Sequence, residues 1–335
     1  METATVDDLD RRILHALGLD GRASFSRIAT LLDVSDQTVA RRYRRLRTRG
    51  VARVVGLCDL RRTGGCQWWV RLQCTPGAAP AIAAALARRP DTTWVQLLSG
   101  GTEILCGVQT VTSEIREPLL LDRLPRSSRI TSVAAYSLLH TFAGGMMNDG
   151  LELLGALTEE QVRRFAPTPR PPVDDVPTEL DDLDRSLFAV LAKDARLTHA
   201  ELAVLVGWSE STVRRRMERL EETGVLYYDL EIDTAMLGLH ACAWLWLAVH
   251  PSALAAVGTA IARHPETAFA AATTGPTNLA ASIVCRDIAS LYRHLSERVG
   301  TLEGVQHVET VPIVRTVKQG GAVLPNLGTR PSVAS

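Results

Sequence analysis

Hydrophobic residues recur at helical spacing in two widely separated parts of the chain. In each part they fall at i, i+4 and i+8, which places them on one face of an α-helix. These positions are Leu9, Ile13 and Leu17 in the first part and Leu183, Leu187 and Leu191 in the second. Acidic residues come just before both runs and suit the positive end of a helix dipole. The pattern predicts a helix at the start of each part.

Two further helices are predicted after each of these. Ser24 in the first part and Thr198 in the second are good N-cap residues for a second helix. Ser35 and Ser209 can cap a third helix in the same way. The apolar stripe of this third helix consists of Val39, Tyr43 and Leu46 in one part and of Val213, Met217 and Leu220 in the other. Three short helices with a tight turn before the last are typical of a helix-turn-helix.

The residues at the helix crossing and in the turn fit this motif. Ala29 and Ala203 supply the small side chain that is needed where the first two helices of the motif cross. Gly207 lies in the second turn, where a positive φ is often required. Asp33 takes its place in the first turn, and Asp also tolerates that conformation.

The two parts are copies of one unit. The segment DDLDR at residues 7–11 recurs at residues 181–185, and the offset of 174 holds without a gap as far as Val51 and Val225. Nineteen of these 45 aligned positions are identical. Self-similarity at a fixed offset indicates a duplicated domain.

The order of elements after each helix-turn-helix is also repeated. Apolar runs and Ala/Leu-rich stretches predict β-α-β-β-α-β in both halves, the split βαβ pattern. The expected elements are strands 68–75, 93–99, 102–110 and 130–142 with helices 77–88 and 112–124, and strands 241–250, 267–274, 278–286 and 305–317 with helices 252–264 and 287–299.

An amphipathic helix over residues 149–165 and the proline-rich stretch APTPRPPVDDVPTEL separate the halves. The expected domains are a helix-turn-helix at 5–60, a βαββαβ domain at 66–142, a helix and linker at 143–178, a second helix-turn-helix at 179–235, a second βαββαβ domain at 239–318 and a flexible tail at 319–335.

The exposed face of each third helix is polar and rich in arginine. In a helix-turn-helix this helix enters the major groove, where Arg contacts guanine or phosphate and a capped helix N-terminus can meet a phosphate. The residues expected to bind double-stranded DNA are Ser35, Gln37, Thr38, Arg41, Arg42, Arg44 and Arg45, together with Ser209, Ser211, Thr212, Arg215, Arg216 and Arg219. The alternative, a solvated helix face, is weakened by the three-helix context in both copies.

The two third helices differ in charge. Residues 35–50 carry six Arg against Asp36 alone, whereas residues 209–224 carry four Arg and four Glu. Phosphate neutralisation supplies most nonspecific affinity for DNA. We therefore expect the first copy to hold DNA more strongly, and replacement of Arg41 and Arg45 to weaken binding more than replacement of Arg215 and Arg219.

Composition excludes several other classes of protein. The six cysteines form no CxxC pair and have no His at metal-ligand spacing, which predicts buried thiols, no metal and a reducing compartment. The first ten residues do not resemble a signal peptide. Residues 241–262 carry no Asp, Glu, Lys or Arg, but Pro251 interrupts them, so a strand and a buried helix are expected in place of a membrane span. A cytoplasmic location without a cofactor follows as an expectation.

These motifs together resemble the Lrp/AsnC (feast/famine) family of prokaryotic transcription regulators. The resemblance rests on LDDLDR, on the stretch DGRASFSRIATLLDVSDQTVARR and on the duplicated βαββαβ order, and it covers about 5–142 and 179–318. It implies an α+β fold, with two copies of a winged helix-turn-helix and a ferredoxin-like (RAM- or ACT-like) domain. It also implies sequence-specific DNA binding and no enzymatic activity. Most members carry one unit per chain, so this is a tandem form.

The resemblance further implies that the α/β domains bind small effectors, often amino acids. The matching turns contain Gly100, Gly101, Thr102 and Glu103 in the first copy and Thr274, Gly275, Thr277 and Asn278 in the second. Neither copy keeps the Asp that is usual in the family, and Asn278 is neutral. The other interpretation is a plain hairpin turn in which Gly supplies a positive φ.

The α/β domains are also expected to mediate self-association, because the central strands WWVRL and AWLWLAV are apolar on both faces. The tandem arrangement allows one chain to imitate a family dimer internally.

Two rival functions share the fold. Sirohaem decarboxylases resemble this family and also occur as fused double units, but the segments 92–100 and 267–275 contain no His, Arg or Lys, and His140, His240, His250 and His307 are scattered singly. A ligand-sensing or interaction module with helix-turn-helix scaffolds is the third class, and retention on heparin or random DNA separates it from a regulator.

Overall fold

The computed structural model describes residues 6–110, 128–144, 156–165, 177–320 and 322–323. These residues divide into two compact units. Unit 1 consists of Met1–Gly65 and Leu138–Val311, and unit 2 consists of Cys66–Ser137 and Pro312–Ser335. We describe each unit by itself.

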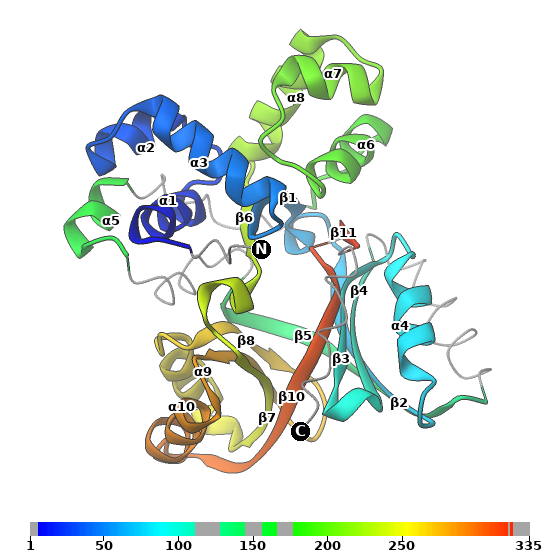
Figure 1. Cartoon of the computed structure of the whole chain (residues 1–335). Coiled ribbons are helices and arrows are strands. Elements are labelled where there is room, and N and C mark those ends of the chain that lie inside the picture. Colours follow the sequence, from blue (N-terminus) through cyan, green and yellow to red (C-terminus); the bar gives the residue numbers. More distant parts are fainter. Residues whose placement is uncertain (1–5, 111–127, 145–155, 166–176, 321, 324–335) are drawn as a thin grey trace. The chain divides into compact units, whose positions relative to one another are not determined.

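Unit 1 contains both helix-turn-helix domains (Figure 1). Their helices are α1 (Asp8–Leu19), α2 (Phe25–Leu32) and α3 (Asp36–Thr48) in the first copy and α6 (Asp182–Leu191), α7 (His199–Val206) and α8 (Glu210–Glu222) in the second. The predicted caps are confirmed, since Ser24, Ser35, Thr198 and Ser209 each accept a hydrogen bond from a backbone N–H of the first turn. The turn residues are left-handed as expected, with φ 55° at Asp33 and φ 74° at Gly207.

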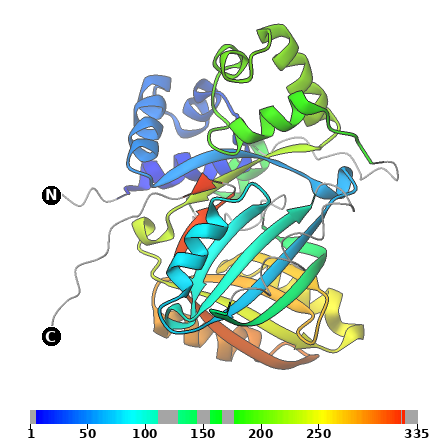
Figure 2. The same cartoon turned by 90° about the vertical axis from the view of Figure 1, so that its right-hand side faces the viewer.

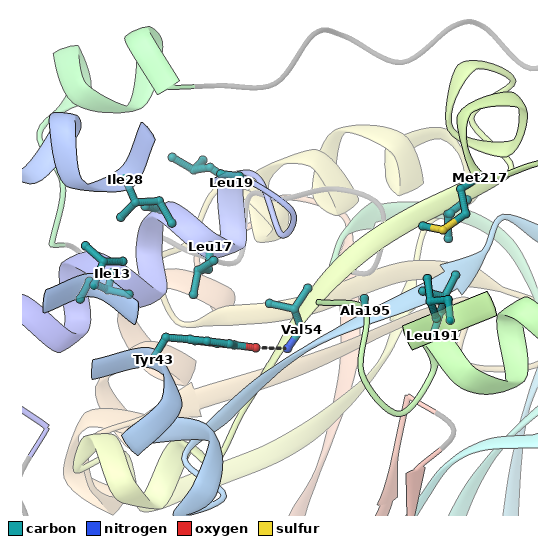
Figure 3. Packing of buried hydrophobic residues seen from close by; sticks show 14 of the residues in the cluster. Ile13, Leu17, Leu19, Ile28, Tyr43, Val54, Leu191, Ala195 and Met217 are labelled. Carbon is teal, nitrogen blue, oxygen red and sulfur yellow. Dashed lines mark hydrogen bonds between the residues drawn. The ribbon is translucent and has the colours of Figure 1, made fainter. Parts of the chain in front are cut away.

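The strand after each helix-turn-helix pairs with its counterpart in the other copy. Strand β1 (Ala52–Cys58) runs antiparallel to β6 (Leu226–Ile232) over seven residue pairs. The wing expected for each copy is therefore shared between the two copies. The pairing places the two helix-turn-helix domains on one hydrophobic cluster, to which Tyr43 and Val54 of the first copy and Leu191 and Met217 of the second all belong (Figure 3).

The second α/β domain has the predicted element order within unit 1. Its elements are β7 (Ala241–Val249), α9 (Leu254–Ala262), β8 (Thr267–Thr273), β9 (Leu279–Cys285), α10 (Ile288–Arg293) and the first part of β10 (Val305–Gln319). A π-helical turn, His294–Val299, follows α10. Strand β9 lies between β7 and β8, and β8 also pairs with the end of β5, Leu138–Ala143.

Unit 2 holds the first α/β domain. Its elements are β2 (Cys66–Cys74), α4 (Ala79–Ala87), β3 (Thr92–Leu98), β4 (Glu103–Thr110) and the first part of β5 (Ile130–Ala143). Helix α4 covers one face of the sheet (Figure 2). The outer edge of β3 pairs with the last part of β10, beyond Val311. The helix expected at 112–124 lies outside the described residues.

Two expectations about connecting segments change. The helix predicted over 149–165 is observed as α5, Glu159–Phe165, and residues 145–155 lie outside the described part of the chain. The tail predicted from residue 319 is partly ordered, because Gln319 ends β10 and β11 (Ala322–Val323) pairs with it.

Candidate nucleic-acid interface

Helix α3 buries the predicted apolar stripe and exposes the predicted polar face. Val39, Tyr43 and Leu46 are at most 4% exposed. On the other side a shallow hollow of about 310 Å³ is lined by Arg41, Arg44, Arg45, Thr48 and Arg49. Arg41, Arg44 and Arg49 bring to this hollow three guanidinium groups that form no ion pair with a described residue, which suits an anion such as phosphate.

The predicted Arg42 and Arg45 are engaged by carboxylates of α1 and its cap. Asp10 is fully buried, and its two oxygens bind Arg42 at 3.1 Å and Arg45 at 2.5 Å. Arg42 also binds Asp7, and this hydrogen bond lowers the pKa of the Asp7 carboxyl. These arginines therefore tie α3 to α1, a role that their sequence position did not reveal.

The second copy has the same ion-pair arrangement. Asp184 is fully buried and lies 3.1 Å from Arg219 and 3.6 Å from Arg216. Arg216 also binds Asp181 at 2.8 Å. Burial raises the pKa of Asp184 despite the two arginines. The motif DDLDR therefore supplies, in both copies, the anchor for the third helix.

The remaining charges differ between the two copies. On α3 and its C-cap, Arg41, Arg44 and Arg49 are exposed and form no ion pair with any described residue. On α8, Arg215 is the one arginine that is exposed and forms no ion pair with any described residue, since Arg214 lies 4.0 Å from Glu218. The difference in charge between α3 and α8 that the sequence predicts therefore remains when the arginines that form ion pairs within the protein are left out of the comparison.

The cap hydroxyls are partly occupied. Ser35 Oγ accepts a hydrogen bond from the Thr38 N–H and lies 2.9 Å from Thr38 Oγ1. Ser209 makes the matching contacts with Thr212, and Ser211 Oγ lies 3.1 Å from Ser209 Oγ. Gln37 is exposed and extends from the first turn of α3. These residues gather at the N-terminus of each third helix, as predicted.

Two arginines that sequence reasoning missed link the copies. Arg22 donates to the Ala195 carbonyl at 2.9 Å and to the Leu197 carbonyl at 3.4 Å. Arg196 donates to the Gly21 carbonyl at 2.7 Å and to the Ala23 carbonyl at 3.0 Å. The sequence signal that could have identified them is that Arg occupies the same position of the repeat in both copies.

The expected effector turn of the first copy is a tight turn between β3 and β4. Gly100 and Gly101 have φ values of 70° and 91°, as the hairpin interpretation requires. Thr102 Oγ1 donates to the Ser99 carbonyl. The Glu103 carboxylate is 2% exposed and accepts from Arg71 at 2.5 Å and from Ser99 at 3.0 Å. The Glu103 carboxylate is therefore paired with Arg71 inside unit 2.

The turn of the second copy is held by Asn278. Its side chain accepts from the Val249 N–H and donates to the Val249 carbonyl, both at 2.9 Å. Gly275 has φ 106° and, like Thr274, is exposed. Thr277 Oγ1 is buried and has no hydrogen-bond partner among the described residues. This hydroxyl is a buried polar atom of the turn that the described residues leave unsatisfied.

Histidines and cysteines form no cluster of metal-ligand type. No group of three or more His, Cys, Asp or Glu side chains that could hold a metal occurs among the described residues. The six cysteines are free, and burial raises the pKa of the Cys106 thiol to about 12. His264 and His294 do meet, with ring centroids 5.1 Å apart, but burial lowers both pKa values and the His294 side chain is 1% exposed.

The helices of the described segments are too short or too polar to cross a membrane.

Comparison with known families places these domains. The AsnC-type helix-turn-helix domain matches residues 6–47 and again 180–221, and the Lrp/AsnC ligand binding domain matches residues 242–323. The three segments span about half of the chain. The chain belongs to the Lrp/AsnC family. The first two segments coincide with α1–α3 and α6–α8, and the third contains the second α/β domain.

Curated Lrp/AsnC relatives correspond to one half of this chain. The HTH-type transcriptional regulator FL11 of Pyrococcus furiosus is 27% identical over 141 residues, which are 42% of this chain and 93% of FL11. The regulatory protein AsnC of Escherichia coli is 29% identical over 150 residues, which are 42% of this chain and 96% of AsnC. The tandem chain is thus about twice as long as these regulators.

A solved structure matches both halves at once. The siroheme decarboxylase NirDL is similar over 93% of each chain, with a TM-score of 0.60 and 14% sequence identity. This likeness extends the match from single domains to the duplicated fold.

Proposed function

We propose that this tandem Lrp/AsnC protein is a sequence-specific DNA-binding transcription regulator. The observation that carries the proposal is the set of exposed arginines on α3, Arg41, Arg44 and Arg49, which no described carboxylate neutralises. An arginine-rich third helix of a helix-turn-helix suits the major groove, where Arg binds guanine or phosphate in a bidentate manner.

The two third helices contribute unequally. Copy one brings three unneutralised arginines to DNA, whereas copy two brings Arg215 beside exposed glutamates. Carboxylates oppose phosphate contact, although Glu can accept a hydrogen bond from cytosine. Helix α3 therefore supplies the stronger hold, and α8 the weaker and more selective contact.

Substitution of Arg41 and Arg44 by alanine tests this function. Each lost phosphate contact lowers the slope of log affinity against log salt by about 0.9, so the double variant should bind more weakly with a slope reduced by up to about two. These two residues are preferable to Arg41 and Arg45, because Arg45 also binds the buried Asp10. Fluorescence anisotropy on a genomic fragment over several salt concentrations gives the slope.

Arg163→Ala/Arg164→Ala is the matched control, since it removes two exposed arginines from α5 and leaves α3 intact. Equal losses in the control and the α3 variant would contradict the proposed interface. Arg215→Ala should cost less affinity than Arg41→Ala. A larger loss from Arg215→Ala would contradict the assigned roles.

We further propose that an amino-acid-like effector binds near the β8–β9 turn. The buried, unsatisfied Thr277 hydroxyl and the exposed Gly275 support this location. A ligand at about 100-fold its dissociation constant adds about 2.7 kcal/mol to stability. A thermal-shift screen with amino acids and pathway intermediates tests the idea, and no shift from any of them would contradict it.

Self-association through the α/β domains is proposed as well. Leu139, Ile288 and Tyr292 are 63%, 71% and 70% exposed and lie in these domains. Light scattering at micromolar concentration should detect a species larger than one chain. A monodisperse monomer would contradict association between chains.

The decarboxylase alternative shares only the fold. His140, His240, His250 and His307 are all exposed, and they lie on separate segments. Incubation of the protein with sirohaem under anaerobic conditions distinguishes the two functions, because a regulator leaves its carboxylates intact.

A further inference from the structure

We propose that one chain recognises two unlike half-sites arranged as an inverted repeat, so that it binds DNA in one orientation only. This inference rests on the proposed DNA-binding function and specifies the class of operator. It follows from two observations. The β1–β6 ribbon and the contacts around it form a symmetric frame, whereas the third helices that this frame carries, α3 and α8, differ in their exposed residues.

The frame is symmetric because the β1–β6 ladder maps onto itself when the copies are exchanged. Ala52 pairs with Ile232, and the equivalent pair, Leu226 with Cys58, is also present. At the centre Val55 pairs with Asp229, its own counterpart at an offset of 174. A local twofold axis therefore passes between these two residues and relates the two helix-turn-helix domains.

Reciprocal hydrogen bonds extend the same symmetry to the loops that join the first two helices of each copy. Arg22 and Arg196 each donate to two carbonyls of the other copy, and the acceptors are themselves equivalent residues of the repeat. The Arg196 guanidinium also lies 4.4 Å from the centroid of the Phe25 ring. Bidentate guanidinium contacts fix orientation as well as distance.

At Gly21 the close approach of the copies leaves no space for a larger side chain. A Cβ atom on Gly21 would lie 2.7 Å from Val54 Cγ1 and 2.8 Å from Tyr228 Cβ. The two domains therefore form one block within unit 1. Two helix-turn-helix domains related by a twofold axis contact half-sites of opposite direction, typically about one helical turn apart.

The contact residues break this symmetry. Thr38 and Arg41 are retained in the second copy as Thr212 and Arg215, so the half-sites share some features. The neighbouring positions differ: Gln37 is replaced by Ser211, Arg44 by Glu218 and Arg49 by Thr223. All six are exposed.

The replaced side chains favour different bases. Gln pairs in a bidentate manner with adenine and Arg with guanine, whereas Glu accepts from cytosine and Ser discriminates weakly. A perfect palindrome offers the same base edges to both copies and cannot satisfy both. The preferred operator is therefore an inverted repeat in geometry with unlike sequences in its two arms.

Selection of bound duplexes from a random pool with the full-length protein identifies the two arms. Three synthetic duplexes are then compared: the selected site, a palindrome of the α3 arm and a palindrome of the α8 arm. We expect the selected site to bind about tenfold or more tightly than either palindrome. Insertion of about half a helical turn between the arms should cost a similar factor, because the frame fixes their separation.

A variant with a matched second helix sharpens the test. Ser211→Gln/Glu218→Arg makes the exposed face of α8 resemble that of α3 without altering a buried residue. This variant should prefer the palindrome of the α3 arm, while Arg163→Ala/Arg164→Ala should retain the preference of the natural protein.

Equal affinity of the natural protein for the selected site and the α3 palindrome would overturn the inference and leave DNA binding intact. Selection of a palindromic consensus would overturn it in the same way. Failure to enrich any duplex at low salt would instead overturn the proposed function itself.

Discussion

Three buried carboxylates determine which arginines of the third helices are available to DNA. Asp10 and Asp184 each bind two arginines of their own copy, and Arg47 is bound at 2.5 Å by Asp194 of the other copy. The sequence predicted the polar face of α3 correctly. It could not separate arginines that contact DNA from arginines that hold the fold, because their partners lie more than thirty residues away in the chain.

Arg42→Ala should destabilise the protein by about 1–3 kcal/mol. The Asp10 carboxylate is fully buried, so loss of one partner leaves an oxygen that water cannot solvate. Urea unfolding of the variant measures the change.

Arg41→Ala is the control, because this exposed side chain has no ion pair among the described residues and should change stability by no more than about 0.5 kcal/mol. Equal stability of the two variants would show that Asp10 does not depend on Arg42.

At the scale of elements, the helices were predictable and the strand pairing was not. Caps, periodicity and the Gly207 turn are local signals, and they identified all six helices of the helix-turn-helix domains and the starting point of four of them. Strands β1 and β6 pair across about 174 residues of chain, and nothing local specifies that contact. One cross-strand feature was available in principle, since Arg53 stands opposite Glu231.

Glu231 makes the β1–β6 ribbon sensitive to pH. Burial raises the pKa of this carboxyl to about 8, although Arg53 opposes the change. Below about pH 4.5 the carboxyl is protonated in both the folded and the unfolded chain. As the pH rises towards 8, the unfolded chain releases the proton and the folded chain retains it, so this contribution to stability is progressively lost.

Glu231→Gln should therefore gain stability relative to the natural protein as the pH is raised from 5 to 8. Urea midpoints at several pH values measure the difference, with Glu159→Gln, which alters a 95% exposed side chain, as the control. A constant difference between Glu231→Gln and the natural protein across this range would disprove the role of Glu231.

At the scale of the whole molecule, the repeats and the compact units do not coincide. The repeat predicts α/β domains at 66–142 and 239–318, whereas the compact units divide after Gly65, Ser137 and Val311. The difference arises because β5 and β10, with 14 and 15 residues, each continue into the other unit. Their predicted length of 13 residues was a signal, since most strands have about five or six.

The last segment of β10 completes unit 2. Lys318 is 3% exposed and donates to the Arg89 carbonyl at 2.6 Å and to Thr92 Oγ1 at 3.2 Å. Thr316 Oγ1 accepts from the Gln96 amide, and Val317 packs against the apolar cluster under α4. A strand from the far end of the chain thus closes the edge of a sheet whose other strands lie between residues 66 and 137.

Ending the chain after Val311 should therefore loosen unit 2 and spare unit 1. Trypsin should cleave within residues 66–137 much faster in the shortened protein, because the edge of β3 and its apolar neighbours lose their cover. Affinity for a duplex bound by the full chain should stay within about threefold, since both helix-turn-helix domains belong to unit 1.

Lys318→Met in the full chain should destabilise unit 2 more mildly than the truncation, by about 1–3 kcal/mol, because it removes two buried hydrogen bonds. Unchanged cleavage in both proteins would show that residues 66–142 form an independent domain, as the repeat alone predicts.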